Sequence, residues 1–176
     1  MIVVVGFMGA GKTTVGRLIA ERLGLPFLDS DLVIEHRQRR SIKDIFTAEG
    51  EEGFREIEAA SIAELLDGPP CVLSLGGGAC GRADTRARLR DHTVVYLHVE
   101  LDEALARVGR DERRPLLHDA GLPARYAARL DVYAQTATIT FRTTGRRVED
   151  IGREIIDAIS GTAAHRDLAP NGADHG

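Results

Sequence analysis

A glycine-rich stretch near the N-terminus contains the residue types needed to bind phosphate. Residues 6–13 read Gly-Phe-Met-Gly-Ala-Gly-Lys-Thr and fit the pattern G-x-x-x-x-G-K-[ST]. Glycines let backbone N–H groups approach phosphate oxygens, because no side chain stands in the way. Lys12 can reach the β- and γ-phosphates of a nucleotide, and the Thr13 hydroxyl can coordinate Mg²⁺. The stretch predicts a nucleotide-phosphate site built from Gly9, Ala10, Gly11, Lys12, Thr13 and Thr14.

The two flanks of this stretch support the prediction. Residues 2–5, Ile-Val-Val-Val, form a β-branched run that is typical of a buried strand, and apolar residues recur at helical spacing after Lys12. A strand, a glycine loop and a helix in this order place a helix N-terminus against the phosphates. With both flanks in place, a chance glycine-rich turn is the weaker interpretation.

Two carboxylates follow the next expected strand, residues 26–28. Asp29 and Asp31 stand where open α/β sheets bind ligands, at the carboxyl end of a strand. One could serve a hydrated metal ion and the other an acceptor hydroxyl, as its base, although either could instead cap the following helix. The apolar run 72–75 ends in glycines rather than a carboxylate, and we find no N-K-x-D segment for guanine. This pattern favours a small-molecule kinase over a switch GTPase.

Phosphoryl transfer builds negative charge on oxygen, so a kinase needs cations besides Lys12. The arginine-rich segment 109–117 contains a proline and is too charged for a core, so we predict a lid over the site; a solvated loop is the alternative. Arg55 and Arg129, on two separate predicted helices, could converge on a substrate carboxylate.

The remaining pattern alternates strands with helices and predicts a parallel sheet covered on both faces. Residues 32–67 are predicted to be helical in two or three pieces, broken at Gly50 and Gly53. Arg82, Arg86 and Arg90 are spaced for one helix face, which we interpret as solvated. Strands are expected at 2–5, 26–28, 71–75, 94–97 and 138–141, with a last helix at 148–159. We expect one domain, residues 1–160, and a disordered tail, residues 161–176.

Composition limits the partners and the compartment. The chain has 176 residues and a net charge of −4, which gives no electrostatic reason for binding nucleic acid or an anionic membrane. Its two cysteines form neither a disulfide framework nor a zinc motif. No run approaches the roughly 18 apolar residues of a membrane span, and the first apolar run is too short for a signal peptide. We expect a cytoplasmic monomer.

Taken together, the motifs resemble the shikimate kinase family across roughly residues 1–160. The carrying segments are residues 6–16, 28–31 (Leu-Asp-Ser-Asp), 50–58 (Gly-Glu-x-x-Phe-Arg-x-x-Glu), 73–78 (Leu-Ser-Leu-Gly-Gly-Gly) and 113–117 (Arg-Arg-Pro-Leu-Leu). The resemblance implies a three-layer α/β P-loop kinase fold with a five-stranded parallel sheet, a helical substrate-binding part near residues 31–60 and a lid near 109–120. It also implies that MgATP phosphorylates the 3-hydroxyl of shikimate, a step toward chorismate and the aromatic amino acids.

The same resemblance assigns roles to individual residues. Asp31 would be the base, Asp29 would hold magnesium through water, and Arg114 would be the catalytic lid arginine that also touches the nucleotide. Arg55 and Arg129 would bind the shikimate carboxylate, and backbone at Gly76, Gly77 and Gly78 would approach the substrate. Arg107 and Arg147 would lie near adenine, with Arg146 as an alternative to Arg147.

Two other functions remain open from the sequence. A gluconate-kinase-like enzyme shares the glycine-rich stretch and the acidic pair, and a regulatory module could bind ATP without transferring phosphate.

Overall fold

The computed structural model of the chain describes the backbone of residues 1–109 and 121–167, and the side chains up to residue 161. The predicted lid, including Arg114, therefore lies outside the described residues. So does the last part of the predicted tail, residues 168–176.

The centre of the molecule is a five-stranded parallel sheet. Its strands are β1 (Ile2–Val5), β2 (Phe27–Asp29), β3 (Val72–Ser74), β4 (Thr93–His98) and β5 (Ile139–Arg142), in the spatial order β2-β3-β1-β4-β5. All four pairings are parallel. β1 and β3 are buried along their whole length, as expected for strands covered on both faces, and β1 is accordingly a continuous apolar run. The predicted α/β fold with a five-stranded parallel sheet is confirmed.

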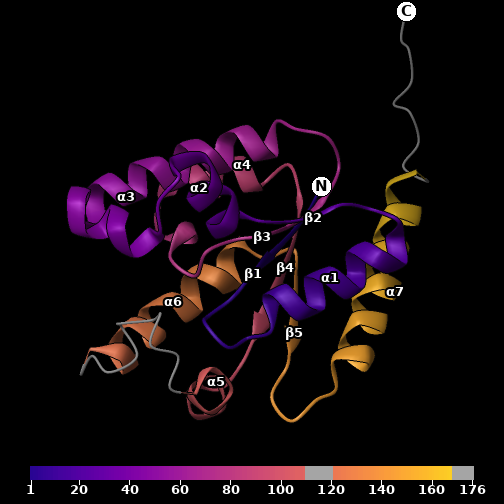
Figure 1. Cartoon of the computed structure of the whole chain (residues 1–176). Helices are drawn as coiled ribbons and strands as arrows, with labels where there is room; N and C mark the ends of the chain where they lie inside the picture. Colours follow the sequence, from indigo (N-terminus) through magenta and orange to yellow (C-terminus); the bar gives the residue numbers. More distant parts are fainter. Residues whose placement is uncertain (110–120, 168–176) are drawn as a thin grey trace, which may run out of the picture.

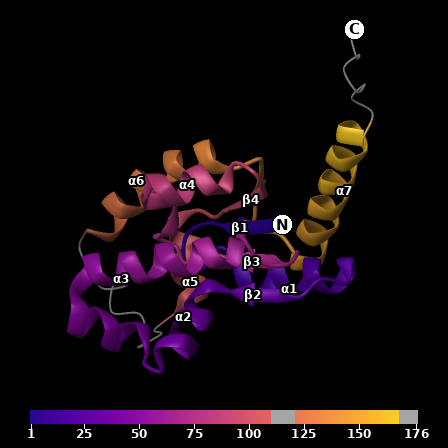
Figure 2. The same ribbon diagram turned by 90° about the horizontal axis from the view of Figure 1, so that it is seen from above.

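Helices cover both faces of this sheet (Figures 1 and 2). α1 (Lys12–Leu23) and α7 (Val148–Asp167) pack together on one face, and α4 (Ala83–Leu89) and α6 (Leu122–Thr136) lie on the other. α2 (Ser30–Gln38) and α3 (Ile42–Leu66) pack on each other and extend beyond the sheet, whereas α5 (Leu101–Val108) lies near the ends of β4 and β5. A short 3₁₀ helix, η1 (Ala79–Gly81), follows the triple glycine.

Local sequence explains where the helices near the site begin and bend. α1 begins after Gly11, at φ 91°, a conformation that favours glycine. α3 begins with a capping box, in which Ser41 and Asp44 bond each other's backbone N–H groups. The predicted break at Gly50 is a kink within α3, with φ 73°, whereas Gly53 does not interrupt the helix.

A second, small apolar cluster holds α2 and α3 together. Ile34 of α2 and Ile45 and Phe54 of α3 are buried in it, and the Phe46 and Phe54 rings stack with centroids 4.5 Å apart. Burying each such side chain contributes about 2 kcal/mol. The cluster fixes the α3 turns that follow Phe54, so it sets the position of Arg55.

The predicted disordered tail begins too early in the chain. α7 continues to Asp167, so residues 161–167 are helical rather than part of a disordered tail. The sequence there, Gly-Thr-Ala-Ala, contains one residue that disfavours helix by about 1 kcal/mol, and the following alanines favour it. η1 was not expected, because its three residues are too few to show a period. Within residues 1–109 and 121–167, no helix is long and apolar enough to cross a membrane.

Candidate active site

The glycine-rich stretch forms a tight loop between β1 and α1. Gly6 and Gly9 have φ values of 150° and 74°, and an added Cβ would lie 2.5 Å from a backbone carbonyl oxygen in either case. Those carbonyls belong to Leu97 of β4 and Ala104 of α5, so the backbones of both elements pack closely against the loop. The Lys12 ammonium donates to Gly6 O at 3.0 Å and to Phe7 O at 3.1 Å. It is therefore held over the loop, where incoming phosphates would meet it.

Asp29 caps the helix that follows it and also contacts Thr13 of the phosphate loop. Its Oδ1 accepts from Asp31 N at 3.1 Å and so caps α2, while its Oδ2 accepts from the Thr13 hydroxyl at 3.3 Å. A hydroxyl and a carboxylate are hard oxygen donors, which Mg²⁺ prefers, and they lie beside the phosphate loop. This donor pair fits a hydrated magnesium ion, which Thr13 would bind and Asp29 would hold through water.

Asp31 lies against the triple glycine after β3. A Cβ added at Gly76 would lie 2.5 Å from Asp31 Oδ1 and 2.8 Å from Glu58 Oε1, so any side chain there would displace these carboxylates. The Gly76 N–H donates to the hydroxyl of Ser30, which is fully buried, at 3.0 Å. In the Asp-Ser-Asp segment, Asp29 therefore caps α2, Ser30 anchors the triple glycine, and Asp31 lies beside Gly76.

Replacing Gly76 with alanine is expected to displace Asp31 and Glu58. Overpacking of this kind costs about 1–3 kcal/mol, and the displaced carboxylate should lower turnover far more than it lowers nucleotide binding. Thermal unfolding and steady-state kinetics measure the two effects. Gly81→Ala is the matched control, because an added Cβ there meets nothing within 4 Å. Equal behaviour of the two variants would contradict the close contact.

Arg55 is held above the third glycine. Its guanidinium donates to Glu58 at 2.7 Å and to Glu51 at 3.3 Å, and a Cβ at Gly78 would lie 2.4 Å from both Nη atoms. Burial acts to lower the Arg55 pKa, but the neighbouring carboxylates outweigh it and raise that pKa. Burial also raises the pKa of Glu58, against the opposing pull of Arg55. Glu58 thus fixes the charged Arg55 guanidinium against the backbone of Gly78.

Arg129 approaches the same loop from α6. A Cβ at Gly77 would lie 3.6 Å from Arg129 Nη1, and its guanidinium lies 5.8 Å from the centroid of the Phe7 ring. Tyr133, one helical turn further on, is buried and donates its hydroxyl hydrogen to Gly77 O. Arg55 and Arg129 therefore come to adjacent glycines from separate helices, the geometry needed to grip one carboxylate.

The three arginines predicted near adenine lie in different places. Arg107 bonds Gly9 O and the loop after β5. Arg146 bonds Glu154 and Arg142 O, while the Arg147 side chain is 77% exposed and lies 3.5 Å from Glu149. Arg107 is the one of these three with a bond to the phosphate loop, and Arg114 lies outside the described residues.

Several residues that shape the site were given no role from the sequence. Glu58, Ser30 and Tyr133 are buried polar side chains that hold Arg55, Gly76 and Gly77. Arg86, which we interpreted as solvated, donates to Cys80 O and Gly81 O at 2.8 Å each. It therefore fixes η1, the 3₁₀ helix that follows the triple glycine. Glu58 lies three residues after Arg55, a spacing that indicates an ion pair on a helix. Arginine is so frequent in this chain that the spacing alone does not show whether the pair forms.

Comparison with known proteins shows the family of this chain. The family model described as "Shikimate kinase" matches residues 8–160. The chain belongs to the shikimate kinase family. It is 47% identical over 153 residues to a shikimate kinase of Thermobifida fusca, covering 85% of this chain and 89% of that protein. The predicted family and enzyme class, an ATP-dependent phosphotransferase, are thereby confirmed.

Solved structures separate the two kinase hypotheses. A shikimate kinase from Acinetobacter baumannii in complex with shikimate superimposes with a TM-score of 0.86 at 39% identity, covering 92% of this chain and 93% of the other. A gluconokinase from Sinorhizobium meliloti reaches a TM-score of 0.58 at 21% identity, covering 95% of each chain, and shares the fold alone.

Proposed function

We propose that this protein transfers the γ-phosphoryl group of ATP to the 3-hydroxyl of shikimate, giving shikimate 3-phosphate and ADP. The observation that carries the proposal is the pair of arginines from separate helices above Gly77 and Gly78, with Asp31 beside the same loop. A small acid with ring hydroxyls has the two features that this arrangement recognises. The related structure with bound shikimate supports the choice of acceptor.

The residues divide the chemistry between them. Arg55 and Arg129 would bind the acceptor carboxylate and turn the ring so that its hydroxyl meets Asp31. Asp31 would accept the hydroxyl proton while the acceptor oxygen bonds to the γ-phosphorus. The bond from that phosphorus to the bridging oxygen breaks, and ADP leaves with that electron pair. Lys12 would stabilise the charge on the transferring group.

The metal site belongs to the same proposal. Thr13 and Asp29 would hold Mg²⁺, which when bound neutralises phosphate charge during transfer. Arg114 stays a predicted lid cation. We further expect a monomer that acts in the cytoplasm.

A coupled assay of ADP release, with MgATP and one acceptor at a time, tests the function. We expect ADP to form in proportion to added shikimate, and only background ADP with gluconate or without acceptor. ADP release with gluconate instead would favour the alternative kinase. Nucleotide binding without turnover of either acceptor would favour the regulatory module.

A further inference from the structure

We propose that Glu103 of α5 is a positioning residue for the nucleoside part of the bound nucleotide. It would act by holding Arg107 and the loop after β5 in place beside the phosphate loop. The inference rests on the proposed function only in that a nucleotide binds the glycine-rich stretch. We call the residues involved the clasp: Gly9, Glu103, Arg107, Thr143 and Gly145.

The Glu103 carboxylate joins two segments that are far apart in the chain. Both of its oxygens accept from the Gly145 N–H, at 3.1 and 3.0 Å, and Oε1 also accepts from Arg107 one helical turn later. Gly145 has φ 67°, so its N–H is presented by a tight turn that favours glycine. Glu103 therefore fixes the shape of the loop between β5 and α7.

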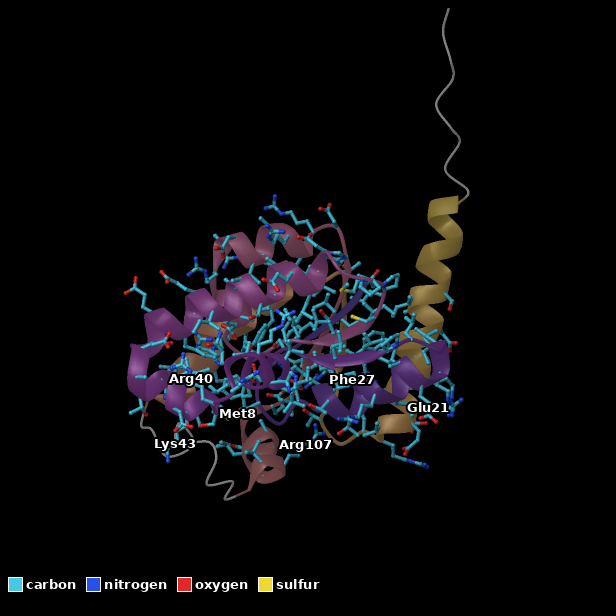
Figure 3. The ribbon with its side chains drawn as sticks, turned by 45° about the horizontal axis from the view of Figure 1, so that its top comes forward. Met8, Glu21, Phe27, Arg40, Lys43 and Arg107 are labelled. Carbon is cyan, nitrogen blue, oxygen red and sulfur yellow. The ribbon has the colours of Figure 1, made fainter. Side chains whose placement is uncertain are left out.

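Arg107 extends the clasp to the phosphate loop. Its Nη1 donates to Gly9 O and to Thr143 Oγ1, both at 3.2 Å, and its Nη2 donates to Thr143 O at 2.6 Å. Thr143 is buried and anchored to β4, since its N–H donates to His98 O at 2.8 Å. Arg107, labelled in Figure 3, lies where α5 meets the rest of the fold.

The strand order indicates which ligand lies over the clasp. The acceptor residues follow β2 and β3 or come from the helices beside them, and the phosphate loop follows β1 in the middle of the sheet. A nucleotide whose phosphates lie on that loop must extend its nucleoside away from the acceptor. That direction leads over the ends of β4 and β5, where α5 and the loop containing Thr143 and Gly145 meet.

The clasp has two parts, the contact between α5 and the phosphate loop and the loop after β5, and they are held in different ways. Gly9 lies against the backbone of Ala104, so α5 and the phosphate loop touch without help from any side chain. The loop after β5 depends more on side-chain bonds, and Glu103 supplies the acceptor for Gly145 N–H and a charge for Arg107. The side chains of Glu103 and Arg107 are 28% and 30% exposed, so water can replace these bonds. Loss of Glu103 should therefore loosen the nucleoside side and leave the phosphate loop in shape.

Two ligands separate these parts: ADP, and inorganic tripolyphosphate, which has phosphates but no nucleoside. In Glu103→Ala we expect the dissociation constant of ADP to rise about tenfold, because two bonds that order the loop are lost. That of tripolyphosphate should change less than about twofold. The KM for ATP should rise with the ADP constant, while the KM for shikimate stays close to that of the unmodified protein. Glu103→Gln, which retains an acceptor for Gly145 but no charge, should fall between.

Asp102→Ala is the matched control. Asp102 is exposed and carries the same charge in the same first turn of α5, so it reproduces any effect on the helix dipole. We expect its ADP affinity to match the unmodified protein. The proposal is overturned if Glu103→Ala binds ADP normally, or if it loses ADP and tripolyphosphate equally. These binding results hold even if shikimate were not the acceptor, which the turnover assay detects separately.

Discussion

Asparagine in place of Asp31 is expected to lower shikimate-dependent turnover by about 10²–10⁴-fold, the usual contribution of a general base. Asparagine keeps the shape of the side chain but cannot accept a proton at neutral pH. ADP binding should persist, because the phosphate loop and Lys12 lie on the other side of the site from the acceptor. Turnover is measured by coupled ADP release and binding by titration with ADP.

Asp29→Asn is the control that separates the two carboxylates. Asp29 caps α2 and faces Thr13, so its loss should raise the Mg²⁺ concentration needed for half-maximal turnover. Asp31→Asn should leave that requirement unchanged. Near-normal turnover in Asp31→Asn would show that the base is another group. The same conclusion would follow if Asp31→Asn raised the Mg²⁺ requirement as Asp29→Asn does.

Alanine in place of Arg55 is expected to damage both binding and stability. The KM for shikimate should rise by about 10²-fold, since a charge-assisted bond to the substrate is lost. Glu58 is 2% exposed and would be left as a buried carboxylate without its partner. Breaking a buried pair in this way costs about 3–5 kcal/mol, and we expect the lower end because Arg55 is 20% exposed. Urea unfolding and shikimate kinetics measure the two losses.

The stability loss should depend on pH with a definite sign. Burial already raises the pKa of Glu58, and Arg55 opposes that rise. Without Arg55 the pKa of Glu58 in the folded protein rises further above its value in the unfolded chain. The folded state then holds the proton more tightly, so the loss is small at low pH and grows as pH rises through the folded-state pKa. We expect a smaller loss at about pH 5 than at about pH 8.

The double variant Arg55→Ala/Glu58→Gln isolates the cause. Glutamine removes the buried charge, so stability and its pH dependence should largely recover. The KM for shikimate should remain high, because the arginine is still missing. If the double variant is as unstable as Arg55→Ala, the loss comes from packing of the arginine stem rather than from the unpaired carboxylate.

The fold was largely predictable because its signals are local. A β-branched run marked β1, and Gly50 marked the kink in α3. The errors arose where a local signal was weak or misleading. Three residues of η1 show no period, and Gly161 suggested an end to α7 that the alanines after it override.

The site was predictable where glycine and carboxylate spacing carried the information. Asp29, Asp31 and the triple glycine follow their strands directly, so strand order alone brings them together. The supporting residues could not be found in this way, because Ser30 and Tyr133 act through contacts with residues 46 and 56 positions away. Arg86 lies on a face that looks solvated in sequence, and the loop carbonyls that it bonds are visible only in three dimensions.

The position of β1 between β3 and β4 also bears on how ligands could be combined. Asp31 and the triple glycine follow β2 and β3, the clasp lies on the β4–β5 half of the sheet, and the phosphate loop after β1 lies between them. A bisubstrate compound, which joins an acceptor mimic to a nucleotide, would have to pass over that loop through its phosphate chain. Because both half-sites are anchored to one sheet, the span is fixed. A linker of matching length would bind with an affinity above that of either part, through effective concentration alone.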